Sequence, residues 1–117
     1  MELYMVGKYK SLVAKIIGEL DHHAAVNARE MIDRELQKTG AVNLIFDFSR
    51  TSFMDSSGIG VIMGRYKIVR ALGGKIVIAG ASDMLERIIK MSGIGDLIKT
   101  VHTVDEAFEE VTENVLQ

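Results

Sequence analysis

Two adjacent serines, Ser56 and Ser57, are the side chains best placed for chemistry in this chain of 117 residues. They lie in the polar turn Phe53–Gly60, between an apolar run that ends at Phe48 and a longer apolar segment that begins at Val61. This spacing places both hydroxyls where a helix should begin. The first N–H groups of a helix lack internal partners and carry partial positive charge, so an exposed serine there is suited to bear a phosphate. One of the two serines is therefore a candidate phosphorylation site.

The serine turn can also be interpreted without phosphorylation, in two ways. Asp55 or a serine can simply cap the helix, and Gly58 lets the chain turn tightly, although a cap needs only one side chain. Ser56 could instead be a nucleophile on a strand-to-helix elbow, but Met54 stands where that motif requires glycine. None of the three histidines has a visible partner that would orient it as a base. The pattern argues against a catalytic serine and leaves a cap and a phosphorylation site open.

Composition favours a single domain that binds a protein or a small molecule. A chain of this length can bury one hydrophobic core, so we expect one domain over residues 1–117. It has no cysteine, no signal-peptide pattern and no apolar run of about 20 residues. Its net charge of −2 comes without a basic patch for nucleic acid or for a membrane. We therefore expect a cytoplasmic monomer.

Strand and helix patterns alternate along the chain. Apolar segments predict strands at 3–6, 12–17, 42–48, 75–79 and 97–101. Helical spacing, with Asp21, Ser82 and Thr103 as capping residues, predicts helices at about 21–40, 56–72, 82–92 and 103–115. The first two strands form a hairpin. This order predicts an α/β fold with a mixed, mostly parallel sheet of about five strands packed with about four helices, and an antiparallel N-terminal edge.

The predicted helix after the serine turn carries two apolar stripes. The side that should face the sheet holds Val61, Ile62, Ile68, Val69 and Leu72. Roughly opposite lie Ile59, Met63 and Tyr66. The helix at 82–92 also has a second stripe, made of Met84, Ile88 and Met91. Either another helix covers these second stripes, or they form a docking face whose rim can be phosphorylated.

A second segment worth weighing begins with Asp21 and continues with His22 and His23. Consecutive residues at a helix start point in different directions, and no further histidine or cysteine lies nearby, so we predict no metal site. We also predict no cofactor. Asp21 is either a helix cap or an acidic contact for a partner's arginine.

The segments Gly18–Ala24 and Ser52–Lys67 together are similar to one protein family. With Gly73-Gly74 and the later Met91-Ser92-Gly93, they resemble the anti-sigma factor antagonists of the STAS-domain family, above all their sporulation type. The likeness spans nearly the whole chain. It implies a single STAS domain and a binding protein rather than an enzyme.

The resemblance also implies a partner and a site. In that family the unphosphorylated antagonist binds an anti-sigma factor that is also a serine kinase of the AB type, with ADP or ATP bound, and thereby frees the sigma factor. Phosphorylation of the first serine after the aspartate, Ser56 here, ends the interaction, and a metal-dependent serine phosphatase restores it. The implied partner-binding positions are Asp21, Asp55, Ser57, Gly58, Ile59, Met63 and Ile88. The alternative is a STAS regulatory or ligand-binding module of a general stress or other partner-switching pathway.

Overall fold

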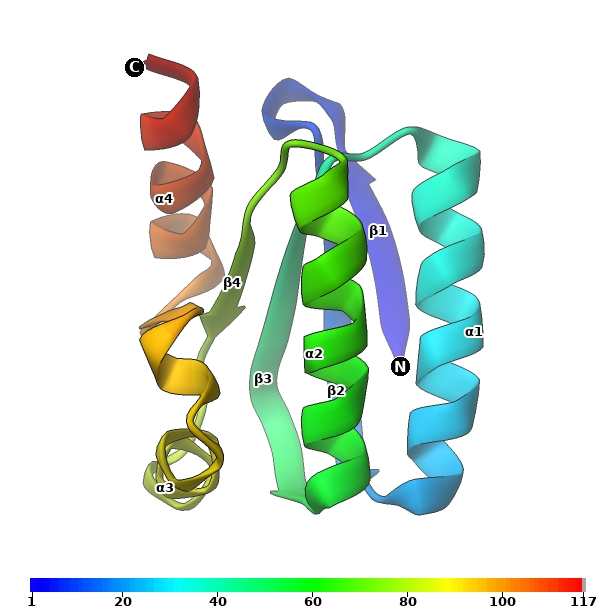
Figure 1. Cartoon of the computed structure of the whole chain (residues 1–117), viewed down its shortest axis with the longest axis vertical. Helices are drawn as coiled ribbons and strands as arrows, with labels where there is room; N and C mark the ends of the chain where they lie inside the picture. Colours follow the sequence, from blue (N-terminus) through cyan, green and yellow to red (C-terminus); the bar gives the residue numbers. More distant parts are fainter. Residues whose placement is uncertain (117) are drawn as a thin grey trace.

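A computed structural model describes residues 1–116 of the chain, which form one five-stranded sheet with helices on both of its faces (Figure 1). In chain order the elements are β1 (Glu2–Val6), the 3₁₀ turn η1 (Gly7–Tyr9), β2 (Ser11–Leu20), α1 (His22–Thr39), β3 (Asn43–Met54), α2 (Ser56–Ala71), β4 (Ile76–Ala79), α3 (Asp83–Ser92), the 3₁₀ turn η2 (Ile94–Asp96), β5 (Lys99–Val101) and α4 (Val104–Leu116). The sheet order is β1-β2-β3-β4-β5, with β1 antiparallel to β2 and every other pair parallel. The predicted fold class is confirmed.

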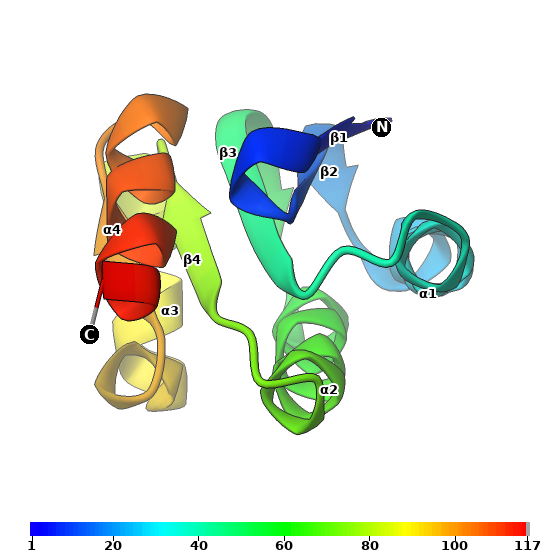
Figure 2. The same cartoon turned by 90° about the horizontal axis from the view of Figure 1, so that it is seen from above.

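The alternation of side chains along the central strands builds two separate cores. On β3, Leu44 and Phe46 point into the larger core with α1, α2 and α3, whereas Ile45 points into a smaller core with α4. Figure 2 shows α1 and α2 on one side of the sheet, and α4 beside β4. Because both faces are covered, the middle of each central strand is a continuous apolar run, at 12–14, 44–46 and 76–79. None of the helices within residues 1–116 is both long enough and apolar enough to cross a membrane.

The strands β2 and β3 are longer than predicted, and they extend past the rest of the sheet. The predicted ends at Ile17 and Phe48 are wrong, because pairing continues until Leu20 lies opposite Met54. The Thr51 hydroxyl supports this extension by donating a hydrogen bond to the Ile16 carbonyl at 2.7 Å. The neighbouring strands β1 and β4 have already ended here, so fewer side chains of the extension are covered. An apolar pattern therefore could not mark it.

The predicted helix ends follow the local capping chemistry. Asp21, Ser82 and Thr103 each accept a hydrogen bond from a backbone N–H of the first turn, at 2.9, 3.2 and 3.1 Å. Gly40 and Gly93 end α1 and α3 in the left-handed conformation, as their positions predicted. One predicted strand is shorter than expected, because residues 94–96 form η2 and β5 begins only at 99.

Helix α2 buries a different set of residues from the predicted stripe. Val61, Ile62 and Val69 are buried as predicted. Ile68 and Leu72, however, are 37% and 49% exposed, which corrects their assignment to the face on the sheet. Ile68 lies at the margin of the buried arc, and Leu72 is the C-cap residue beyond the last helical residue.

An ion pair links α2 to α1 halfway along both helices. Arg65 is only 6% exposed, and its Nε lies 3.0 Å from Oδ1 of Asp33. Burial lowers the pKa of the Arg65 guanidinium, and the neighbouring Asp33 carboxylate opposes that shift. The two helices are therefore held side by side by a charged contact as well as by apolar packing.

Candidate functional site

The serine turn lies beside a second strand-to-helix junction of the same plan. Strands β2 and β3 end at Leu20 and Met54, which are direct partners across the parallel pair. One aspartate follows each strand, Asp21 before α1 and Asp55 before α2. Both helices consequently begin at the same end of the molecule (Figure 1). We call the two segments Leu20–Ala24 and Met54–Gly58 the paired junctions.

Asp55, and neither of the serines, caps α2. Its Oδ1 accepts a hydrogen bond from the N–H of Ser57 at 2.8 Å, and its carbonyl accepts the N–H groups of Gly58 and Ile59 at 3.1 and 3.3 Å. A cap needs only one side chain, and Asp55 supplies it. Capping therefore accounts for the residue type at Asp55 and leaves both serines without an assigned role in the cap.

The two serine hydroxyls have different environments. Ser56, the first residue of α2, is exposed, and its hydroxyl makes no hydrogen bond within the described chain. Ser57 is half-buried, and its Oγ lies 3.3 Å from Nδ1 of His22, the first residue of α1. Sequence reasoning missed this contact between the paired junctions. The repeated order of apolar residue, aspartate and two polar residues at both junctions is the signal that could have suggested it.

Gly58 is buried, and packing explains why this position is glycine. A Cβ at this position would lie 2.5 Å from Cγ of Met54 and 3.1 Å from the carbonyl oxygen of Leu20. The first turn of α2 therefore rests directly on the ends of β2 and β3. Gly58 is itself buried, so its contribution to a partner-binding surface, which the family resemblance implies, stays a prediction.

The second apolar stripes are neither fully covered nor fully exposed. Ile59, Met63 and Ile88 are half-buried and pack against the larger core. The structure thus lies between the two alternatives, a covered stripe and an exposed docking face, because neither Ile59 nor Ile88 is fully exposed. On α3, Met84 is 39% exposed and Met91 is 87% exposed.

Two further aromatic side chains contribute to the surface around α2. Tyr66 lines a groove of about 270 Å³ between α2 and residues on the far side that include Leu97 and Glu110. Phe53, the residue before Met54 at the end of β3, is 40% exposed, and it was not among the predicted site residues. Successive residues of a strand point to opposite faces, so the burial of Met54 indicates that Phe53 points outward.

The acidic side chain of the first junction is engaged in the fold, whereas its two histidines lie at the surface. Asp21 is half-buried and is engaged as the cap of α1. The rings of His22 and His23 lie edge to face with their centroids 6.2 Å apart, and both residues are exposed. Across the part of the chain that the structure describes, no three His, Cys, Asp or Glu side chains are grouped to hold a metal ion.

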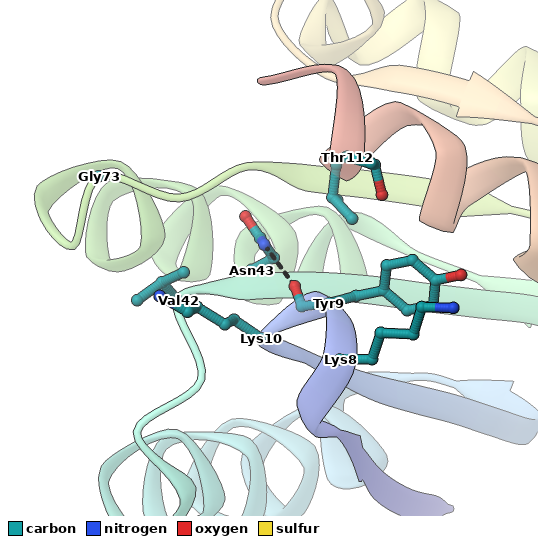
Figure 3. Close-up of a pocket in the computed structure, with 8 residues that line it drawn as sticks. Lys8, Tyr9, Lys10, Val42, Asn43, Gly73 and Thr112 are labelled. Atoms are coloured by element: carbon teal, nitrogen blue, oxygen red, sulfur yellow. Dashed lines mark hydrogen bonds between the residues drawn. The ribbon is translucent and has the colours of Figure 1, made fainter. Parts of the chain in front are cut away.

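A pocket of about 340 Å³ lies at the opposite end of the molecule from Ser56, between η1, the start of β3 and α4 (Figure 3). The Asn43 amide donates to the Tyr9 carbonyl at 3.0 Å and accepts the N–H of Lys75 at 2.8 Å. The Asn43 side chain thus connects the start of β3 to η1 and to the residue before β4. The pocket is separate from the paired junctions.

Comparisons with known proteins agree on one family. Residues 4–107 match the STAS domain. The chain is 33% identical over 102 residues to the anti-sigma F factor antagonist of Paenibacillus polymyxa, covering 87% of this chain and 85% of that protein. It is 34% identical over 84 residues to the anti-sigma-B factor antagonist of Listeria monocytogenes, covering 72% and 73%.

Solved structures give the same result. The chain superimposes on the anti-sigma factor antagonist SpoIIAA in its unphosphorylated form with a TM-score of 0.75 and 30% identity, covering 95% of this chain and 96% of that one. A Bacillus SpoIIAA in the phosphorylated form matches with a TM-score of 0.73 and 33% identity, covering 94% and 97%. Relatives of this chain are thus antagonists of anti-sigma factors, and SpoIIAA exists with and without a phosphate.

Proposed function

The chain belongs to the STAS-domain family, and we propose that within it the protein is an anti-sigma factor antagonist switched by phosphorylation of Ser56. Its unphosphorylated form binds an anti-sigma factor that is also a serine kinase of the AB type, and so releases the sporulation sigma factor in the cytoplasm. Transfer of a phosphoryl group from ATP to Ser56 ends binding, and a metal-dependent serine phosphatase restores it. The catalytic groups belong to the partners.

The observation that carries this proposal is the state of the Ser56 hydroxyl. It is exposed, lies on the first residue of α2 and has no hydrogen-bond partner in the described chain, while Asp55 provides the cap. A phosphate at this position would meet the partial positive charge of the helix start. The fold should therefore tolerate the modification, and the effect should fall on whatever binds there.

The surface around Ser56 is suited to a charge switch. A phosphate adds a charge of about −1.5 to −2. Asp55 is adjacent and Asp21 caps the neighbouring helix, so the added charge enters a region that is already acidic. Burying it in an interface that fits the neutral serine costs several kcal/mol, and about 1.4 kcal/mol corresponds to a tenfold loss of affinity. We place the half-buried Ile59, Met63 and Ile88 and the side chains of Asp21, Asp55 and Ser57 in that interface.

The direct test combines the protein with the host's own anti-sigma factor kinase and ATP, and locates the phosphate by mass spectrometry. We expect it on Ser56. Ser56→Ala should fold normally and bind the kinase in a way that ATP no longer reverses, and Ser56→Asp should weaken binding. Ser52→Ala, which removes another exposed hydroxyl four residues earlier, is the matched control and should behave like the wild type. A phosphate found elsewhere would contradict the proposal.

A second candidate partner is supported by the relatives themselves. Antagonists of both the F and the B anti-sigma factors match this chain at similar identity, 33% and 34%. The protein could accordingly serve a general stress pathway in place of sporulation. Measuring the affinity of the unphosphorylated protein for each type of anti-sigma factor kinase separates the two, because only the cognate kinase should bind tightly and modify Ser56.

A further inference from the structure

We propose that His22 decides which of the two adjacent serines receives the phosphoryl group. It does so by holding the Ser57 hydroxyl against α1, which leaves the Ser56 hydroxyl as the available acceptor. The inference rests on the proposed function and adds a positioning residue to it. His22 belongs to the neighbouring junction, 35 residues away in sequence from the serine that it contacts.

The contact is specific to one serine and to one histidine. Nδ1 of His22 lies 3.3 Å from Oγ of Ser57, whereas no hydrogen bond of either serine hydroxyl to His23 is found in the described chain. Ser57 is half-buried, and Ser56 is exposed with its hydroxyl unpartnered in the described chain. Two identical side chains in consecutive positions are thus distinguished by a single neighbour.

Three features of the core hold the two groups in this arrangement. The partner residues Leu20 and Met54 place the starts of α1 and α2 side by side. Gly58 lets the first turn of α2 rest on both strand ends, because any Cβ would push it away. The Asp55 carboxylate holds the Ser57 N–H at 2.8 Å, which fixes the backbone that carries the hydroxyl. The fold therefore places the backbones of the two residues side by side, and the contact itself is made by their side chains at the surface.

The chemistry of the transfer gives this contact its consequence. The serine oxygen forms a bond to the γ-phosphorus of ATP on the kinase, and the bond from that phosphorus to the β–γ bridging oxygen breaks, so that ADP leaves. The hydroxyl proton passes to a base of the kinase. The attacking oxygen must lie in line with the leaving oxygen, and so must point outward to the partner. Ser57 must first break its contact with His22 and rotate, whereas Ser56 need not.

The same contact could in principle activate Ser57, since an imidazole beside a serine hydroxyl can act as a base. Two observations speak against this. Within the described residues no carboxylate is hydrogen-bonded to the other nitrogen of His22 to orient the ring, and Ser57 is the less accessible serine. The two roles predict opposite results when the imidazole is removed.

The test measures the distribution of phosphate between the two serines after reaction with the host's anti-sigma factor kinase and ATP, using site-resolved mass spectrometry. In His22→Ala we expect the share on Ser57 to rise by about three- to tenfold, the range that the net effect of one hydrogen bond gives. His22→Asn places an amide near the position of Nδ1 and should restore the wild-type share. His23→Ala is the matched control and should leave the share unchanged. In a Ser56→Ala background Ser57 is the only acceptor of the pair, and there His22→Ala should raise the rate of Ser57 phosphorylation by the same factor.

The outcomes separate this inference from the proposed function. Modification of Ser56 with an unchanged or reduced share on Ser57 in His22→Ala would overturn the role of His22 and leave the proposed function intact. A wild-type protein that the kinase does not modify at Ser56 would overturn the proposed function instead.

A measurement without the kinase tests the contact itself: Ser57→Ala should shift the ¹⁵N resonance of His22 Nδ1 and not that of His23. An unchanged His22 resonance would remove the basis of the inference.

Discussion

The junctions from β2 to α1 and from β3 to α2 have the same backbone plan and different chemistry. In each, a strand ends at a buried apolar residue, one aspartate caps the next helix, and two polar residues open its first turn. The first turn of α1 continues with Ala24, whereas that of α2 continues with Gly58. The first junction carries histidines and the second carries serines. Capping is thus the shared structural task, and the residues after the cap determine what each junction can do.

The difference between Ala24 and Gly58 reports how closely each helix approaches the sheet. Gly58 lies against Met54 and Leu20, so that there is no room for a Cβ. Ala24 is half-buried and already carries one. Helix α2 therefore starts in tighter contact with the strand ends than α1 does. The serines consequently stand on the helix start that lies closer to the strand ends.

The largest expected effect comes from removing this close approach. Gly58→Ala should destabilise the fold by about 1–3 kcal/mol, because the added methyl group overlaps Met54 and overpacks the junction. The free energy of unfolding from chemical denaturation measures the loss. Gly60→Ala, two residues later on the same helix, is the control, since a Cβ there would meet nothing within 4 Å. That variant should gain up to about 1 kcal/mol in helix propensity. Equal losses in both variants would show that the close approach is not what requires glycine.

A smaller effect is expected from the contact that joins the two helices farther along. Asp33→Ala should cost about 1–2 kcal/mol, because it leaves the buried Arg65 guanidinium without its partner. The loss stays below that of a fully buried pair, since the Asp33 side chain is 40% exposed. Arg65→Met removes the buried charge itself and should cost less. Thermal unfolding shows which of the two variants loses more stability. A larger loss of stability in Arg65→Met would mean that the ion pair contributes net stability of its own.

The smallest effects are expected from replacing the two capping aspartates. These variants distinguish a role of the side chain in helix stability from a role in partner binding. Asp21→Ala and Asp55→Ala should each cost about 1 kcal/mol of stability, because each removes one side-chain acceptor from a helix start. Asp21→Asn keeps the cap and removes the charge, so its stability should change by a few tenths of a kcal/mol. Its affinity for the kinase should nevertheless fall if Asp21 is an acidic contact. Unchanged affinity, measured by calorimetry, would leave Asp21 as a cap alone.

The features that could be predicted from the sequence depend on residues close together along the chain. The caps at Asp21, Ser82 and Thr103 and the glycine ends at Gly40 and Gly93 follow from bonds within one helical turn. Predictions failed where a distant segment decides the result. The extension of β3 is held partly by Thr51 against β2, and the ion pair of the buried Arg65 with Asp33, which was not predicted, joins two helices. Neither partner is visible from local periodicity.

The serine turn also combines features set by neighbouring residues with features set by a distant segment. The order of residue types was enough to place Ser56 and Ser57 at the start of a helix, because capping and helix polarity act over a few residues. It left their hydroxyls equivalent and gave Gly58 only as a residue that lets the chain turn tightly. Their surroundings differ only in the folded chain, because parallel pairing of Leu20 with Met54 brings two helix starts into contact. That contact buries Gly58, turns Ser57 toward His22 and leaves Ser56 facing solvent.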